Sequence, residues 1–257
     1  MPKFISVIST IVALAGFSSA YAEPISFSSG AEKKQLLELY TSQGCHSCPP
    51  AERWFNTLTE HELLWDEVVP VAFHVDYWDY LGWKDPFATP AHSQRQRGYS
   101  RSTGMGVYTP GFVMNGVEWR NFFEFRGRPQ VHANTRAADD ETTVGNLQVT
   151  LENSALTASF NGAFDTEQRL VLNVALLGFD IETSIPRGEN AGKTISHDFV
   201  VLDFQQRSGG QQTPDGARAW SAKLPVQPEA YSKLALAAWV SAEGDPQPLQ
   251  ATGGWLQ

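Results

Sequence analysis

The stretch Leu36-Leu37-Glu38-Leu39-Tyr40-Thr41-Ser42-Gln43-Gly44-Cys45-His46-Ser47-Cys48-Pro49-Pro50 is the most informative part of the sequence. It contains the only two cysteines of the chain, separated by two residues. The apolar run before the cysteines predicts a buried strand over residues 35–40. Proline has no backbone N–H and is best tolerated in the first turn of a helix. The two prolines therefore predict a helix that begins beside Cys48.

This placement has a chemical consequence for Cys45 and Cys48. The unpaired N–H groups at a helix N-terminus favour a thiolate, whose pKa falls from about 8.5 toward ~3.5–7.5. A Cys-x-x-Cys pair between a strand and a helix is typical of thiol–disulfide proteins, and we expect it to be exposed at the helix tip. His46 is a candidate source of positive charge or a hydrogen bond, and a solvated spacer is the alternative.

Glu38 lies within the predicted strand, flanked by leucines. A buried carboxylate with a raised pKa suits the role of proton acceptor for the inner cysteine, Cys48. The alternative is that Glu38 faces solvent at a strand edge, because the facing of the strand is not fixed by the sequence. Glu38 is therefore a candidate catalytic residue.

The segment after the helix predicts a second strand over residues 68–75, which completes a strand–helix–strand unit with parallel strands. Residues 76–108 then form a long, aromatic-rich insertion that follows the carboxyl end of that strand, where α/β proteins place ligands. We expect Trp78, Tyr80 and Trp83 to bind substrate beside the cysteines. The alternative is that these aromatic side chains form a satellite core.

A hairpin is predicted at Asn115-Gly116, which lies between two apolar runs. Thr109-Pro110 stands directly before the first of these runs. Together with residues 39–50, the segments 74–87 and 108–116 resemble a family of bacterial exported proteins with a thioredoxin-like domain, catalogued as domain of unknown function 1223. Residues 187–192 extend the resemblance over most of the chain.

The resemblance implies a thioredoxin-like fold and thiol–disulfide chemistry without a settled substrate. It implies that Cys45 is the attacking thiol, Cys48 the resolving thiol and Pro110 a cis-proline preceded by Thr109. The chain departs from ordinary thioredoxins in having Gln43 and Gly44 before Cys45 instead of a tryptophan, and in its larger insertion. The resemblance to thioredoxins therefore implies neither a redox potential nor a partner for this chain.

The pattern changes after the polar residues 139–145. Short alternating runs with turn signals predict an all-β sandwich from residue 146 to 257. The predicted fold is thus an α/β thioredoxin-like domain (residues 23–140, with the insertion at 76–108) followed by an all-β sandwich-like domain. Arg187, Glu189, His197 and Asp198 form a polar cluster that suits a metal or a partner, or simply caps loops.

The N-terminus carries Lys3, an apolar run and Ala20-Tyr21-Ala22, which predict a secretory signal peptide over residues 1–22. We therefore expect a periplasmic or secreted protein without a membrane span after cleavage. Its formal net charge of −9 argues against nucleic acid as a partner.

Three functions remain open at this point. The first is a thiol–disulfide oxidoreductase acting on protein or small-molecule thiols and disulfides through Cys45 and Cys48. The second is a Cu(I)- or Zn(II)-binding or delivery module of the cell envelope, with His46, His74 or His92 beside the thiolates. The third is a non-catalytic binding protein with a structural disulfide. We expect no cofactor and assign no metal ligand.

Overall fold

The structure is a computed structural model that describes residues 23–124, 131, 143–165, 167–224 and 231–256. Strand accounts for 47% and helix for 18% of the structure, so the protein is mostly β. The predicted signal peptide lies outside the described residues. Among the helices of the described ranges, none has the length and apolar character needed to cross a membrane.

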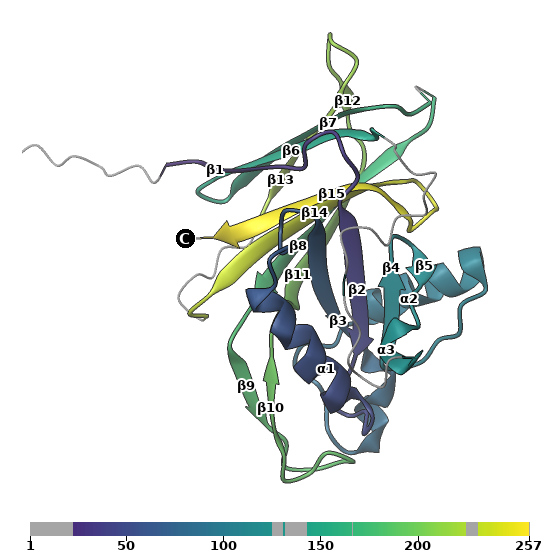
Figure 1. The fold of residues 1–257 in the computed structure, drawn as a ribbon, viewed down its shortest axis with the longest axis vertical. Helices are drawn as coiled ribbons and strands as arrows, with labels where there is room; N and C mark the ends of the chain where they lie inside the picture. The colour runs from purple at the N-terminus through teal and green to yellow at the C-terminus, as the bar shows by residue number, and fades with distance from the viewer. Residues whose placement is uncertain (1–22, 125–130, 132–142, 166, 225–230, 257) are drawn as a thin grey trace, which may run out of the picture.

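One long sheet runs through the molecule (Figure 1). It has eight strands in the order β15-β14-β8-β11-β3-β2-β4-β5. In that order, the strands span Pro248–Leu256, Leu234–Ala242, Leu170–Gly178, Val200–Gly209, Val68–His74, Gln35–Thr41, Gly111–Met114 and Val117–Glu118.

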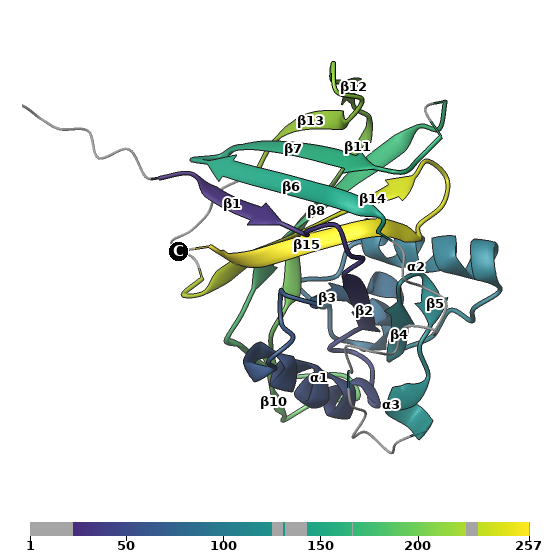
Figure 2. The ribbon, with the colours of Figure 1, turned by 45° about the horizontal axis from the view of Figure 1, so that its top comes forward.

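Two smaller sheets complete the strands. A five-stranded sheet in the order β1-β6-β7-β13-β12 lies over the β15, β14 and β8 end of the long sheet (Figure 2). Its strands span Ile25–Ser28, Gly145–Glu152, Ala155–Gly162, Arg218–Lys223 and Gln211–Gln212. The two-stranded ribbon of β9 (Ile181–Ser184) and β10 (Thr194–His197) extends beside α1 (Figure 1).

The helices gather around the other end of the long sheet (Figure 1). They are α1 (Cys48–Asn56), the 3₁₀ helices η1 (Thr57–Glu60) and η2 (Asp76–Leu81), α2 (Pro90–Thr103) and α3 (Asn121–Glu124). The predicted strand–helix–strand unit is confirmed, because β2 and β3 pair in parallel on either side of α1 in the sequence. The predicted hairpin is also confirmed: β4 pairs with β5, and Asn115 and Gly116 take the positive φ values of 50° and 86° that this turn requires.

Strand β2 has a helix on each face. Successive side chains of a strand point to opposite faces. Glu38 and Tyr40 face α2, where they meet Arg95 and Tyr99. Thr41 faces α1 and donates a hydrogen bond to Glu52. Whether a β2 residue has an even or an odd number therefore decides which helix its side chain faces.

The predicted fold class, a thioredoxin-like α/β domain followed by a separate all-β sandwich, is wrong. Strands β8, β11, β14 and β15 lie beyond the expected boundary, yet they join β3 and β2 in one sheet. The connection is the parallel contact of β11 with β3, where Val200 faces Ala72. One apolar core also spans both halves, from Leu36 and Phe55 to Phe199 and Trp239.

The central strands β8 and β14 are buried along their length because both faces are covered. Leu172 and Leu236 point into a core shared with the five-stranded sheet. Leu177 and Trp239 point into the core that lies under the helices. These strands read as continuous apolar runs for this reason.

A buried ion pair fixes α2 to the sheet. Arg95 donates to Glu38 from Nε at 2.7 Å and from Nη2 at 2.9 Å, and both side chains are almost completely buried. The hydroxyl groups of Tyr40 and Tyr99 also donate to the Glu38 carboxylate. The Arg95 guanidinium lies 4.8 Å from the ring centre of Trp239. The hydrogen bonds of the Glu38 carboxylate are therefore made within the contact that holds α2 on the sheet.

Arg95→Met removes the charge of Arg95 and keeps much of its packing, which leaves Glu38 buried without its counter-ion. We expect a loss of about 3–5 kcal/mol in the free energy of unfolding, measured by denaturant titration. The double variant Glu38→Leu/Arg95→Met should recover most of this loss. A single variant as stable as the wild type would contradict this role of the pair.

His92 makes stability depend on pH. Burial lowers the pKa of His92 from its usual 6.5 to about 4. The unfolded chain therefore takes up a proton first as the pH falls, so this contribution to stability is complete above pH 6.5 and is lost between 6.5 and about 4. Replacing His92 by Gln should remove up to about 3 kcal/mol of that acid sensitivity. Unfolding curves of both proteins across this window test it, and parallel pH profiles would contradict it.

Candidate functional site

The two cysteines form a disulfide at the start of α1. Cys48 is the first residue of the helix, Ser47 is its N-cap, and Pro49 occupies the first turn as predicted. The expected exposure of the sulfur pair is wrong, because Cys45 is 1% and Cys48 0% exposed. His46 and Ser47, between them in the sequence, are exposed, so the disulfide is buried just beneath the surface.

Thr109 and Pro110 lie against Cys45. The predicted cis peptide bond between them is present. The Sγ atom of Cys45 is 3.7 Å from the carbonyl oxygen of Thr109 and 3.4 Å from Oγ of Ser47. The structure therefore brings together four of the predicted site residues: Cys45, Cys48, Thr109 and Pro110.

The aromatic residues predicted to bind substrate have three different environments. Trp78 covers the cysteine loop: its Nε1 donates to Oγ1 of Thr109 at 2.7 Å, and its Cβ lies 3.1 Å from the position that a Cβ on Gly44 would take. Trp83 donates from Nε1 to Oε1 of Gln43 at 2.9 Å. Tyr80 is 77% exposed. Trp78 and Trp83 are thus half-buried against residues around Cys45, whereas Tyr80 is largely exposed.

The connection between β9 and β10 closes the site from the C-terminal half of the chain. Nδ2 of Asn190 donates to the carbonyl oxygens of Gln43 and Cys45, both at 2.9 Å. Glu189 accepts a hydrogen bond from the backbone N–H of His46 at 3.2 Å. Asn190 lies within the segment 187–192 that the resemblance includes, but its contact with a motif 145 residues earlier could not be predicted from the sequence.

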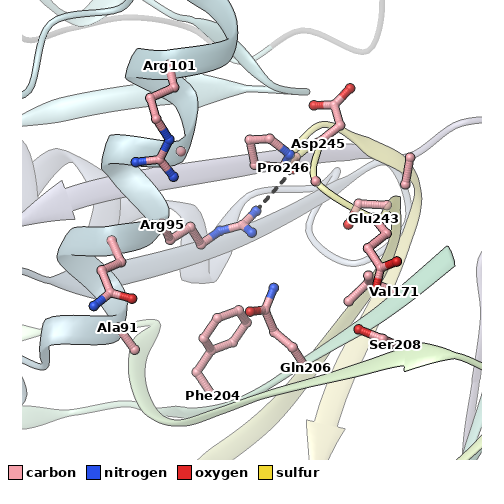
Figure 3. Close-up of a pocket in the computed structure, with 15 residues that line it drawn as sticks. Ala91, Arg95, Arg101, Val171, Phe204, Gln206, Ser208, Glu243, Asp245 and Pro246 are labelled. Carbon is pink, nitrogen blue, oxygen red and sulfur yellow. Dashed lines mark hydrogen bonds between the residues drawn. The ribbon is translucent and has the colours of Figure 1, made fainter. Parts of the chain in front are cut away.

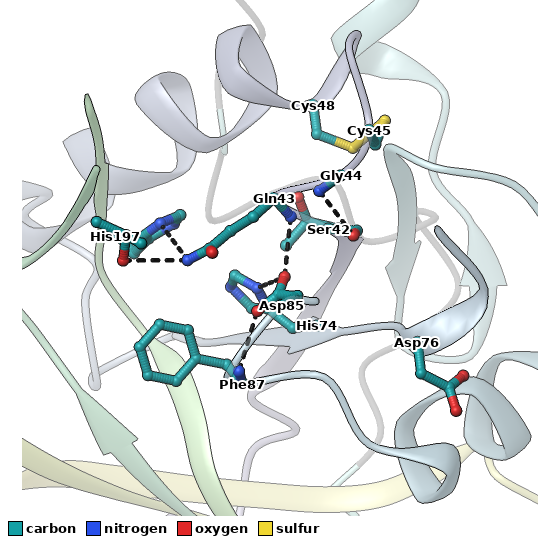
Figure 4. Close-up of polar contacts among 12 residues, drawn as sticks. Ser42, Gln43, Gly44, Cys45, Cys48, His74, Asp76, Asp85, Phe87 and His197 are labelled. Atoms are coloured by element: carbon teal, nitrogen blue, oxygen red, sulfur yellow. Dashed lines mark hydrogen bonds and ion pairs between the residues drawn. A yellow bond between two sulfur atoms is a disulfide. The ribbon is translucent and has the colours of Figure 1, made fainter. Parts of the chain in front are cut away.

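Gln43 links this loop to a buried polar cluster (Figure 4). Its backbone N–H donates to Oδ2 of Asp85 at 2.8 Å, and the same oxygen lies 2.7 Å from Nδ1 of His74. Its side-chain Nε2 lies 3.0 Å from Nε2 of His197. Nδ1 of His197 lies in turn 2.6 Å from Oε2 of Glu52. A continuous chain of polar contacts therefore runs beneath the disulfide-bearing loop.

Neighbouring charges set the pKa values in this cluster. Burial alone raises the pKa of Glu52, but His197 and His74 outweigh it and lower that pKa below its usual value. Burial alone lowers the pKa of His74, but Asp85 outweighs it and raises that pKa above 6.5. The pKa of Asp85 is lowered, because His74 outweighs burial. The carboxylates of Glu52 and Asp85 are thus held in their ionised forms.

Glu38 is not brought to the cysteines. It lies on the face of β2 opposite α1, and its carboxylate binds Arg95, Tyr40 and Tyr99. The carboxylate on the face of α1 is Glu52, one helical turn after Cys48. The signal for Glu52 was its i+4 spacing from Cys48, which places both side chains on one side of the helix.

The histidines considered as partners for thiolate-bound metal make polar contacts with other groups. His46 is exposed, and its Nδ1 lies 3.5 Å from the carbonyl oxygen of Glu189. His92 contacts the carbonyl oxygen of His74 through Nδ1 at 2.9 Å. The described polar contacts of Sγ of Cys45 are with Ser47 and Thr109 and not with these histidines.

A separate hollow of about 470 Å³ lies between α2 and the turn that connects β14 to β15 (Figure 3). Arg95 and Arg101 from α2 and Glu243 and Asp245 from the turn contribute charges of both signs to its lining. Neither cysteine is among its lining residues. It therefore has no direct part in chemistry at the disulfide.

The fold and the site together define a class of mostly β proteins. In this class a Cys-x-x-Cys disulfide lies at the N-terminus of a helix that packs on a sheet, and both halves of the chain contribute strands to that sheet. The chain belongs to the DUF1223 family, described as a protein of unknown function, whose sequence profile matches residues 36–241. No curated protein matches the chain.

Two solved structures are similar to this protein. Protein AGR_C_4864 from Agrobacterium tumefaciens is 25% identical, with a TM-score of 0.55, and the match covers 86% of this chain and 94% of that one. HBP35 of Porphyromonas gingivalis is 16% identical, with a TM-score of 0.57, and the match covers 88% of this chain and 76% of that one. Both matches extend over the two halves of the chain, in agreement with one continuous fold.

Trp78 should limit access to the disulfide. Trp78→Ala removes the indole ring and its hydrogen bond to Thr109, whose net value is about 0.5–1.5 kcal/mol, so opening should become roughly 2–10-fold easier. We expect dithiothreitol to reduce the Cys45–Cys48 bond faster by this factor, as followed by thiol trapping and mass spectrometry. Tyr80→Ala is the matched control, because that ring is 77% exposed. Equal rates in both variants would show that Trp78 is not the cover.

Proposed function

We propose that this protein is a thiol–disulfide oxidoreductase that exchanges two electrons with protein or small-molecule thiols through Cys45 and Cys48. The observation that supports this most directly is the position of the disulfide at the N-terminus of α1, directly below the exposed residues His46 and Ser47. A helix N-terminus stabilises a thiolate, which is both the nucleophile and the leaving group of disulfide exchange.

In the oxidising direction, a substrate thiolate attacks Sγ of Cys45, the Cys45–Cys48 bond breaks, and Cys48 leaves as a thiolate at the helix N-terminus. A second substrate thiolate then attacks the substrate sulfur of the mixed disulfide, and Cys45 leaves as a thiolate. The substrate is oxidised by two electrons, and the protein ends as a dithiol. The reducing direction is the same sequence reversed.

Access to Cys45 requires the loop around it to open. The side chain of Trp78 and the amide of Asn190 hold that loop through single hydrogen bonds to Thr109, Gln43 and Cys45. Such contacts are individually worth about 1 kcal/mol, so opening is compatible with turnover. The exposed ring of Tyr80, at the end of η2, is then the candidate contact for an arriving substrate.

The setting that we propose for this reaction is the periplasm or the exterior of the cell, on the basis of the N-terminal sequence pattern. An oxidising compartment allows the Cys45–Cys48 bond to form and persist.

A Cys48→Ser variant should trap substrates. With the resolving thiol absent, a mixed disulfide at Cys45 is no longer released, so we expect adducts on non-reducing gels of periplasmic extracts that disappear on reduction. The double variant Cys45→Ser/Cys48→Ser is the control and should give none. The absence of adducts from Cys48→Ser would count against the oxidoreductase.

A structural disulfide is the second candidate, and the near-complete burial of both cysteines favours it. The two candidates differ in reduction potential. A pair that equilibrates with redox buffers at about −120 to −270 mV is redox-active, whereas a pair that stays oxidised below about −300 mV is structural. Thiol trapping across glutathione and dithiothreitol buffers separates them.

A further inference from the structure

Glu52, His74 and His197 lie together beneath the disulfide-bearing loop. They come from α1, the end of β3 and the end of β10, and one potential ligand atom from each lies within 4.8 Å of the others. All three side chains are buried. We propose that these residues form a binding site for a divalent transition-metal cation of the Zn²⁺ type.

The ligand set suits this class of ion. Two imidazoles and one carboxylate are a common donor set for Zn²⁺, with bond lengths of about 2.0–2.2 Å and a fourth position for water. Tetrahedral geometry at these lengths places two ligand atoms about 3.3 Å apart. The present separations run from 2.6 Å to at most 4.8 Å, so small side-chain rotations bring the three atoms to that spacing.

Two of the proposed ligand atoms contact only each other among the described residues. Oε2 of Glu52 and Nδ1 of His197 are 2.6 Å apart and form a buried ion pair, and neither atom has a further hydrogen-bond partner there. Buried polar atoms are normally paired, because leaving one unpaired costs about 1–3 kcal/mol. A cation bound to Oε2 and Nδ1 would satisfy both atoms in place of their contact with each other.

The surroundings orient the other ligand atoms. Nδ1 of His74 contacts Oδ2 of Asp85 at 2.7 Å, which leaves Nε2 as the potential ligand atom of His74. A carboxylate on the far nitrogen of a metal-bound histidine is a recurring arrangement that fixes the ring and increases its basicity. Asp85 is itself fixed by the backbone N–H groups of Gln43 and Phe87. Oε1 of Glu52 accepts a hydrogen bond from Thr41, which leaves Oε2 for the ion.

The charge of the site is also suitable. Glu52 and Asp85 bring two negative charges into the protein interior, where each is now offset by its contact with His197 or His74. A dication held by two neutral imidazoles and by Glu52 balances both carboxylates.

Gln43 must adjust for His197 to bind metal through Nδ1. Nε2 of His197 then carries the proton and needs an acceptor, whereas it now lies 3.0 Å from the amide nitrogen of Gln43. Turning the amide over presents its oxygen to His197 and removes the acceptor of Trp83 Nε1. The indole N–H of the half-buried Trp83 would then have to donate to water instead of Gln43. Phenylalanine has no such N–H, so Trp83→Phe should strengthen metal binding.

The proposed site does not depend on the redox function, and the oxidised protein keeps the two alternatives apart. With Cys45 and Cys48 joined, the thiolates are not available as ligands. The test is a titration of the oxidised, chelator-treated full chain with Co²⁺ as a spectroscopic probe, followed by displacement with Zn²⁺. We expect visible absorption that saturates at one Co²⁺ per chain and disappears when Zn²⁺ is added.

Variants locate the site. His74→Gln and His197→Gln should abolish the Co²⁺ signal, and Asp85→Asn should weaken binding about 10–100-fold. His61→Gln, away from the cluster, is the control and should bind as the wild type does, and circular dichroism checks that each variant is folded. The proposal is overturned if the oxidised wild type binds neither ion, if binding persists in both histidine variants, or if binding appears only after reduction.

Discussion

The fold depends on the place where β11 meets β3. The N–H of Ala72 donates to the carbonyl oxygen of Phe199 at 2.8 Å, and Val200 faces Ala72 in parallel register. This short contact joins four strands of the C-terminal half to four of the N-terminal half. Phe199, which has a positive φ of 59°, packs edge-on against Phe55 of α1 and Phe179, so the helix that carries Cys48 rests on residues from the far half of the sequence.

Local features could be predicted from the sequence, whereas the connection between distant strands could not. The two prolines after Cys48 determined where α1 begins, and the Asn115-Gly116 pair determined the hairpin, because both depend on the backbone of a few neighbouring residues. The parallel contact of β11 with β3 links Ala72 to Val200, far apart in the sequence, and has no local signature. The continuous apolar runs of β8 and β14 were the available sign that these strands are covered on both faces, as Leu172 and Leu177 show.

The candidate site was predicted in part for the same reason. Cys45, Cys48, Thr109 and Pro110 come together because each lies at the end of a locally predictable element. Glu38 was assigned to the cysteines because its strand was recognised but its facing was not, and a shift of one residue in a strand exchanges the two faces. The charged residue on the relevant face proved to be Glu52 of α1, paired with His197 from a ribbon that sequence proximity does not connect to it.

The side-chain amide of Asn190 donates hydrogen bonds to the carbonyl oxygens of Gln43 and Cys45, which lie 147 and 145 residues earlier in the chain. Synthesis proceeds from the N-terminus, so Cys45 and Cys48 are made, and leave the ribosome, long before this amide exists. Until the last third of the polypeptide is synthesised, the cysteine loop lacks its hydrogen bonds from Asn190. The two thiols of the nascent chain are therefore most open to oxidation, and to exchange with other disulfides, before synthesis is complete.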